Sequence, residues 1–187
     1  ALAYMTKSVF CEGDIRLSEE IDQLDGVVFM HDFFDSPHVY SSMIFNDFYE
    51  WINHTIELVE RNGMKVGFKG HPNQTAQSIE ILEKLKLRHP NIYWIDPNLS
   101  NIVILGSSIK FGISVYGTVL HELAYFGKIP ICAGDNPHSA FNFIFEAKSI
   151  LDYDNLVLNF NDLILPPHYK EEVAIFYFMH NEYDKED

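Results

Sequence analysis

The chain has 187 residues, of which 47% are hydrophobic and 14% are aromatic, so it can bury a core and is not disordered. Its 13 basic and 27 acidic residues give a net charge of −14, which argues against nucleic acid as a partner, because nucleic-acid binding normally needs a basic face. Cys11 and Cys132 match no disulfide or metal framework, so we expect a reducing cytoplasm. No apolar run reaches the roughly 18 residues of a membrane-spanning helix.

Composition divides the chain into a segment at 1–26, one main domain at 27–180 and an acidic tail at 181–187. The first residue is Ala1 rather than Met. We therefore expect the sequence to be a piece of a longer protein, with 1–26 as an N-terminal or interdomain segment.

Apolar residues spaced by three and four predict helices, and short apolar runs with β-branched residues predict buried strands. In chain order we expect a helix at 17–24, a strand at 27–30, a loop at 31–40, a helix from about 42 that Asn62-Gly63 closes, a strand at 64–68, a helix at 79–87 and a strand at 91–95. A short buried element at 102–105 follows, then a strand at 111–115, a helix at 119–126, a strand at 129–134, and mainly helix at 141–150 and 167–179. The alternation predicts an α/β fold, a Rossmann-like doubly wound parallel sheet flanked by helices.

The segment from Ser114 to Pro130 is the strongest candidate site, because ligands of open parallel sheets bind beyond the carboxyl ends of the strands. Here a strand runs into Gly117-Thr118 and then directly into a helix, whose free N–H groups attract anions. Gly117 would let a phosphate approach the backbone, and the Thr118 hydroxyl adds a donor. Glu122, one turn into the helix, could accept ribose hydroxyls. The alternative is a plain turn with a helix N-cap.

A second candidate follows the strand at 64–68, in the run Lys69-Gly70-His71-Pro72-Asn73. His71 can donate to a phosphate oxygen or protonate a leaving group. The alternative is an ordinary loop histidine.

The loop His31 to His38 is the third candidate, with His31, Asp32 and Asp35 among its polar residues. Its spacing fits no helix face and has no partner cluster, so we expect no metal. A loop that faces substrate, with Asp32 or Asp35 as a base, competes with a solvated loop that contains an Asx turn.

The order strand, Lys69-Gly70-His71-Pro72, helix, strand, and then Gly117-Thr118-x-x-x-Glu122-x-x-x-x-Gly127-Lys128-x-Pro130 is similar to a known pattern. It resembles the C-terminal, nucleotide-sugar-binding half of GT-B glycosyltransferases, and more narrowly the bacterial capsule and surface-polysaccharide transferases. The resemblance covers roughly residues 27–150.

The resemblance implies that His71, Thr118 and the Gly117 backbone contact the donor phosphate, with Lys69 and Ser114 in the same donor-binding set. It implies that Glu122 lies near the donor ribose or sugar, and that the loop with His31, Asp32 and Asp35 faces the cleft between two halves. Gly127 and Pro130 would shape the turn into the next strand.

The function that the resemblance implies is transfer of a sugar from a nucleotide donor, CMP-linked first and UDP-linked next, to a bacterial surface polysaccharide. The partners are the nucleotide sugar, a glycan acceptor and a missing N-terminal domain; no metal or other cofactor is implied. The catalytic base is unassigned, and we expect this chain alone to be inactive. The expected location is the cytoplasm, with peripheral contact of the full-length protein at the inner face of the membrane left open.

Two other functions remain open. The chain could be a noncatalytic module that binds a nucleotide or a protein, or a sugar epimerase with the GT-B layout. A transferase predicts that His71, Thr118 and Glu122 converge on one cleft. An epimerase needs an acid and a base about one sugar carbon, such as Asp32 or Asp35 opposite Glu122.

Overall fold

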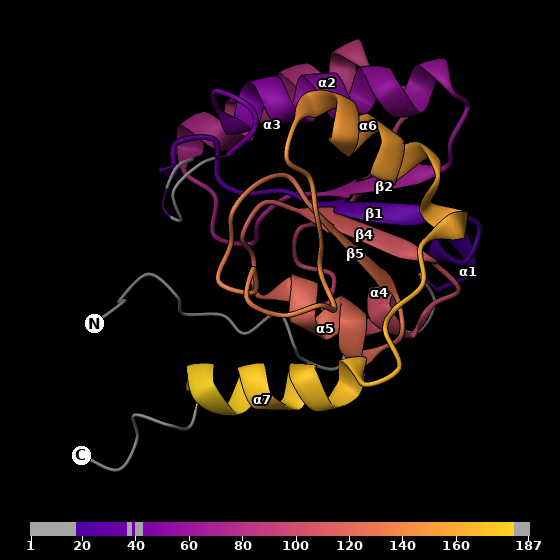
Figure 1. Ribbon diagram of the computed structural model, residues 1–187. Coiled ribbons are helices and arrows are strands. Elements are labelled where there is room, and N and C mark those ends of the chain that lie inside the picture. The colour runs from indigo at the N-terminus through magenta and orange to yellow at the C-terminus, as the bar shows by residue number, and fades with distance from the viewer. Residues whose placement is uncertain (1–17, 37–38, 40–42, 182–187) are drawn as a thin grey trace.

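A six-stranded sheet with only parallel neighbours forms the centre of the computed structural model, which describes residues 18–36, 39 and 43–181 (Figure 1). The strands are β1 (Gly26–Phe29), β2 (Val66–Lys69), β3 (Tyr93–Ile95), β4 (Phe111–Ser114), β5 (Ile129–Cys132) and β6 (Phe145–Glu146). Their order across the sheet is β3-β2-β1-β4-β5-β6, the order of a doubly wound Rossmann-like sheet. The predicted fold class is confirmed.

Helices cover both faces of the sheet (Figure 1). On one face lie α2 (Phe48–Arg61), α3 (Ala76–Arg88) and α6 (Ile150–Leu158). A short 3₁₀ helix, η2 (Phe160–Asp162), follows α6. On the other lie α4 (Asn101–Gly106) and α5 (Val119–Tyr125). The final helix, α7 (Tyr169–Asn181), packs on α5, and the short α1 (Ser18–Ile21) contacts α4. Each face of the sheet therefore has its own apolar core.

The helix α2 shows how the sequence pattern becomes packing. Trp51, Ile52 and Ile56 are fully buried against the sheet, as their spacing on one face requires. The helix begins at Phe48, later than the predicted start near 42, because the Asp47 side chain accepts a hydrogen bond from the Glu50 N–H (2.7 Å) and caps it.

The predicted helix at 141–150 is wrong. This segment instead contains a turn and β6, which pairs with β5, and α6 begins only at Ile150 after the Ser149 cap. Phe141, Phe143 and Phe145 recur with a period of two, which is typical of extended chain rather than helix. Phe143 is fully buried beneath α7.

At the N-terminal end the predicted helix at 17–24 is limited to α1, and Ile21 is fully buried in the α4–α5 core. The expectations for 1–17, including Cys11, for His38, and for the acidic tail at 182–187 lie outside the described residues.

Candidate functional site

The site lies at the carboxyl edge of the sheet, between β1 and β4. Chain order reverses there, since β1 has β2 on one side and β4 on the other. A crevice at such a switch point is the usual ligand site of a doubly wound sheet. The loops after β1 and β4 are tied together here, because the Tyr116 hydroxyl donates to the Ser36 carbonyl (3.1 Å).

His31 is part of the floor of this region. Its ring is 8% exposed, lies 4.8 Å from the Phe48 ring and 4.3 Å from the Tyr116 ring, and its Nε2 lies 3.2 Å from Ser114 Oγ. Burial, and then the nearby His71, lower the pKa of His31 to about 3, so the ring is neutral. His31 and Ser114 thus hold the loops after β1 and β4 in place.

Gly117 lies directly above this pair. A side chain at Gly117 would place its Cβ 3.1 Å from Ser114 Oγ and 3.8 Å from His31 Cε1. Thr118 next to it occupies the N-cap position of α5, but its side chain makes no capping hydrogen bond, and the residue is exposed. The Thr118 hydroxyl is therefore not used to cap the helix.

The carboxylate of Asp32 is held by hydrogen bonds and is not free to act as a base. Its carboxylate accepts hydrogen bonds from the Thr75 N–H (2.5 Å), the Ser78 hydroxyl (2.7 Å) and the Phe34 N–H (2.9 Å). Burial tends to raise the pKa of Asp32, but these hydrogen bonds outweigh it and hold the pKa below its usual range. Asp32 therefore anchors the start of α3 to the loop after β1 and has little capacity left for proton transfer.

His71 follows β2 and is partly buried. The Asn73 N–H donates to its Nδ1 (3.2 Å), so the neutral ring carries its proton on Nε2 and can donate there. Burial lowers the pKa of His71, as does the charge of Lys69, while the charges of Asp35 and Asp32 oppose this. The Asp35 side chain lies on the same edge and is largely exposed. Partial burial, and then the charge of Asp32, raise its pKa, while the charge of His71 opposes the rise.

Lys69 and Glu122 form the other end of the site. Lys69 is only 3% exposed, donates to the Pro97 carbonyl (3.1 Å) and faces the charges of Asp96 and Glu122; burial lowers its pKa to about 8. Burial raises the pKa of Glu122, although a hydrogen bond from Asn101 and the charge of Lys69 oppose the rise. Within the described part of the chain, Glu122 Oε2 and Asn101 Oδ1 are buried without a hydrogen-bond partner.

Asn101 was not among the predicted residues. The signal was the pair Ser100-Asn101 just after the strand that ends at Ile95, because Ser100 caps α4 and thereby brings Asn101 to the same edge.

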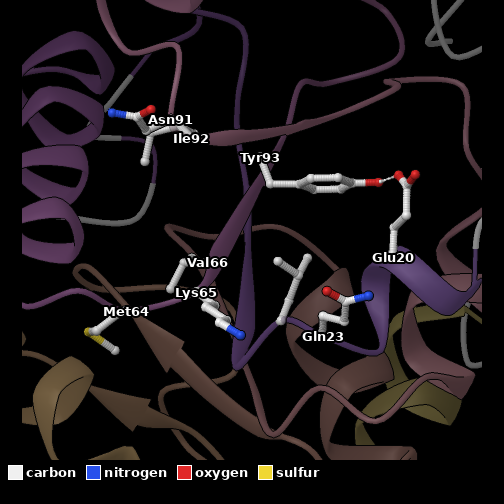
Figure 2. Close-up of a pocket in the computed structure, with 9 residues that line it drawn as sticks. Glu20, Gln23, Met64, Lys65, Val66, Asn91, Ile92 and Tyr93 are labelled. Carbon is white, nitrogen blue, oxygen red and sulfur yellow. Dashed lines mark hydrogen bonds between the residues drawn. The ribbon is translucent and has the colours of Figure 1, made fainter.

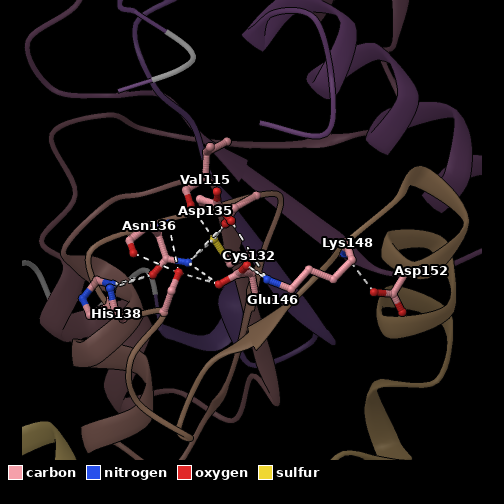
Figure 3. A network of polar contacts seen from close by, with 10 residues as sticks. Val115, Cys132, Asp135, Asn136, His138, Glu146, Lys148 and Asp152 are labelled. Atoms are coloured by element: carbon pink, nitrogen blue, oxygen red, sulfur yellow. Dashed lines mark hydrogen bonds and ion pairs between the residues drawn. The ribbon is translucent and has the colours of Figure 1, made fainter. Parts of the chain in front are cut away.

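A second polar network lies at the carboxyl ends of β5 and β6 (Figure 3). The Asn136 amide donates to Cys132 Sγ (3.1 Å) and to the Gly134 carbonyl (3.2 Å), and it reaches Glu146, which also pairs with Lys148. Burial raises the pKa of the Cys132 thiol far above its usual range, so the thiol is a packing group and not a nucleophile. The loop 135–139 is thereby fixed at the rim of the site.

A hollow of about 270 Å³ opens at the opposite edge, near the amino ends of β2 and β3 (Figure 2). Lys65, Val66 and Tyr93 line it, and the Tyr93 hydroxyl donates to Glu20 (2.5 Å). This hollow is separate from the predicted residues, which gather at the carboxyl edge.

Neither protein-family models nor curated protein sequences match the chain. Among the described residues, none of the helices has both the length and the apolar character needed to cross a membrane. Over the same residues, no three His, Cys, Asp or Glu side chains gather as metal ligands would.

Proposed function

We propose that the chain is the nucleotide-sugar-binding half of a GT-B glycosyltransferase that transfers a sugar to a bacterial surface polysaccharide. One observation supports this most: residues from four separate segments lie near one another at the β1–β4 switch point. They are Lys69 at the end of β2 with His71 in the loop that follows, Ser114 at the end of β4 with Gly117 in the loop that follows, Glu122 in α5, and Asp35 after β1.

The arrangement suits a phosphate-bearing ligand, although the whole chain has a net charge of −14. His71 offers an N–H at Nε2, and Lys69 adds a cation at the end of β2. Gly117 leaves the backbone open to close approach. Donors fixed in advance by the fold can stabilise the negative charge that develops on a leaving nucleotide phosphate.

At the other end of the site, Glu122 and Asn101 present acceptor oxygens, which hydroxyl groups of a ribose or sugar would satisfy. The proposed donor is CMP-linked, with UDP-linked sugars as the second choice. The acceptor and the remaining half of the site would come from another domain, so the proposal for this chain is donor binding rather than turnover.

The epimerase alternative gains no support from Asp32, because that carboxylate is bound by the start of α3. An epimerase would have to use Asp35 with Glu122. A noncatalytic nucleotide-binding module would share the donor site, and transfer activity of a longer protein would separate it from the transferase.

Calorimetric titration of the chain with CMP, CDP, UDP and GDP tests the proposal. We expect one nucleotide to bind preferentially and His71→Ala to weaken it about tenfold, the effect of losing a hydrogen bond to a charged group. The matched control is His89→Ala, since His89 also precedes a proline but lies at the end of α3 and pairs with Glu60. If no nucleotide binds at millimolar concentration, or if both variants behave alike, the proposal is contradicted.

A further inference from the structure

Two neutral histidines lie between α5, α7 and the loop after β5. His121 is 7% exposed and His138 is fully buried, and the Nδ1 of His121 lies 3.3 Å from the Nε2 of His138. Phe176 of α7 covers both rings, with centroid distances of 5.0 Å to His121 and 4.1 Å to His138. The docking of α7 thus closes over this pair.

The proton positions in this pair are fixed by Asn136. The Asn136 Nδ2 faces the Gly134 carbonyl and Glu146, which are acceptors, so its Oδ1 points to His138. This Oδ1 accepts from the His138 backbone N–H (2.9 Å) and lies 3.1 Å from His138 Nδ1, which must carry the proton. The bare Nε2 of His138 then accepts from Nδ1–H of His121.

A proton added to His138 has no place in this chain of hydrogen bonds. Its Nε2 would become a donor that faces the Nδ1–H donor of His121, in a space closed by Phe143 and Phe176. A proton on His121 would add a buried charge beside the same aromatic ring. Both events favour a state in which α7 has moved away and water reaches the rings.

We propose that the His121–His138 pair is an acid-sensitive latch, which holds α7 on α5 and on the loop after β5 and releases the helix on uptake of two protons. The proposal goes beyond the proposed function and does not depend on it.

The direction of the pH effect follows from linkage. Burial, and then the charge of His180, lower the pKa of His121 to about 4. Burial, and then the charges of His121 and His180, lower that of His138 to about 3. Once exposed by release, each ring would return to the ordinary pKa of about 6.5. Below about pH 6.5 the released state therefore binds protons that the docked state does not bind. The equilibrium constant for docking of α7 then falls by up to tenfold per pH unit for each histidine.

Other titratable groups near the pair do not reverse this sign. Among the described residues, α7 contributes His180, stacked on Phe176 at 5.4 Å, and Tyr177, whose ring lies 6.3 Å from that of His121. Glu146 of β6 reaches the pair only through Asn136. Glu172 of α7 binds the same loop at Asn142, 2.7 Å from its backbone N–H.

Hydrogen exchange, corrected for the intrinsic pH dependence, tests the latch on the full 187-residue chain. Below pH 6.5 we expect the protection of α7 to fall by up to about a hundredfold per pH unit, while the protection of α2 stays the same. The double variant His121→Phe/His138→Phe should lose this slope, and the exposed control His168→Gln should keep it. Protection of α7 that does not change with pH, or that falls only together with α2, would overturn the proposal.

Nitrogen-15 spectra of the wild-type imidazoles give a second readout that needs no variant. We expect both rings to be neutral at pH 7, with the proton on Nδ1 of each. A charged His121 or His138 at that pH, or a proton on Nε2 of His138, would also overturn the latch.

Discussion

Lys69, buried at the end of β2, and Glu122, half-buried in α5, act on each other as opposite charges. The two residues are 53 positions apart in the sequence. They come close together because β2 and β4 both flank β1. Each is shifted towards its neutral form by burial, and each opposes that shift in the other. The two charges therefore stabilise each other at this end of the candidate site.

Replacement of Lys69 tests its burial through pH. The pKa of Lys69 is about 8 in the folded chain, so above that pH the unfolded chain holds a proton that the folded one has lost. The free energy of unfolding of the wild type should therefore rise relative to that of Lys69→Met by about 2 kcal/mol between pH 8 and 10. Urea unfolding followed by circular dichroism measures the difference, with the exposed Lys65→Met as control. Parallel curves for the wild type and Lys69→Met would contradict it.

The anchor between Asp32 and α3 gives a second prediction. Asp32→Ala should lower the free energy of unfolding by about 2 kcal/mol at pH 7, because it leaves the Thr75 N–H and the buried Ser78 hydroxyl without their acceptor. The pKa of Asp32 is below its usual range, so this contribution is present above about pH 4 and disappears as the pH falls through the folded pKa. Asp35→Ala, in the exposed part of the same loop, should change stability by less than about 0.5 kcal/mol. Equal losses in both variants would rule out the anchor.

Much of the fold could be predicted from the sequence because parallel strands buried on both faces are short, uninterrupted apolar runs. Runs such as Val27 to Met30 and Phe111 to Val115 indicated strands in the right places. Their alternation with helical patterns then led to the parallel sheet. The prediction for 141–150 was wrong because its phenylalanines were assigned to a helix, although their spacing of two is that of an extended chain.

The candidate site was predictable only in part. Loops after strands must meet at one edge of a parallel sheet, which is why Lys69, His71 and Ser114 lie near one another. The capping role of Asp32 depends on Thr75 and Ser78, 43 and 46 residues away, and no local pattern encodes that contact. The interaction of Asn101 with Glu122 could not be predicted either, since it exists only once α4 and α5 are packed together, and the Ser100 cap indicates only that Asn101 lies at this edge of the sheet.

A substitution at Gly117 should affect nucleotide binding without affecting the stability of the fold. In Gly117→Ala the new Cβ would lie 3.1 Å from Ser114 Oγ, so a small shift of that side chain is enough and the free energy of unfolding should change by less than about 1 kcal/mol. In the proposed donor site the phosphate lies against the Gly117 backbone, so the methyl group would crowd it and nucleotide affinity should fall about tenfold or more. Gly106→Ala, which meets no atom within 4 Å, is the matched control. Unchanged affinity in Gly117→Ala would place the phosphate elsewhere.

The hydroxyl of Tyr153 joins α2 to α6 inside the core. It accepts from Trp51 Nε1 (3.0 Å) and lies 2.7 Å from Thr55 Oγ1, and all three residues are fully buried. Because Thr55 Oγ1 donates to the Trp51 carbonyl (2.8 Å), the Trp51 indole N–H is the group that Tyr153→Phe leaves without a partner. We expect a loss of about 1–3 kcal/mol in the free energy of unfolding, measured by urea denaturation. Tyr125→Phe, on the exposed side of α5, should have no measurable effect, and a Tyr153→Phe variant as stable as the wild type would show that water or repacking satisfies the indole.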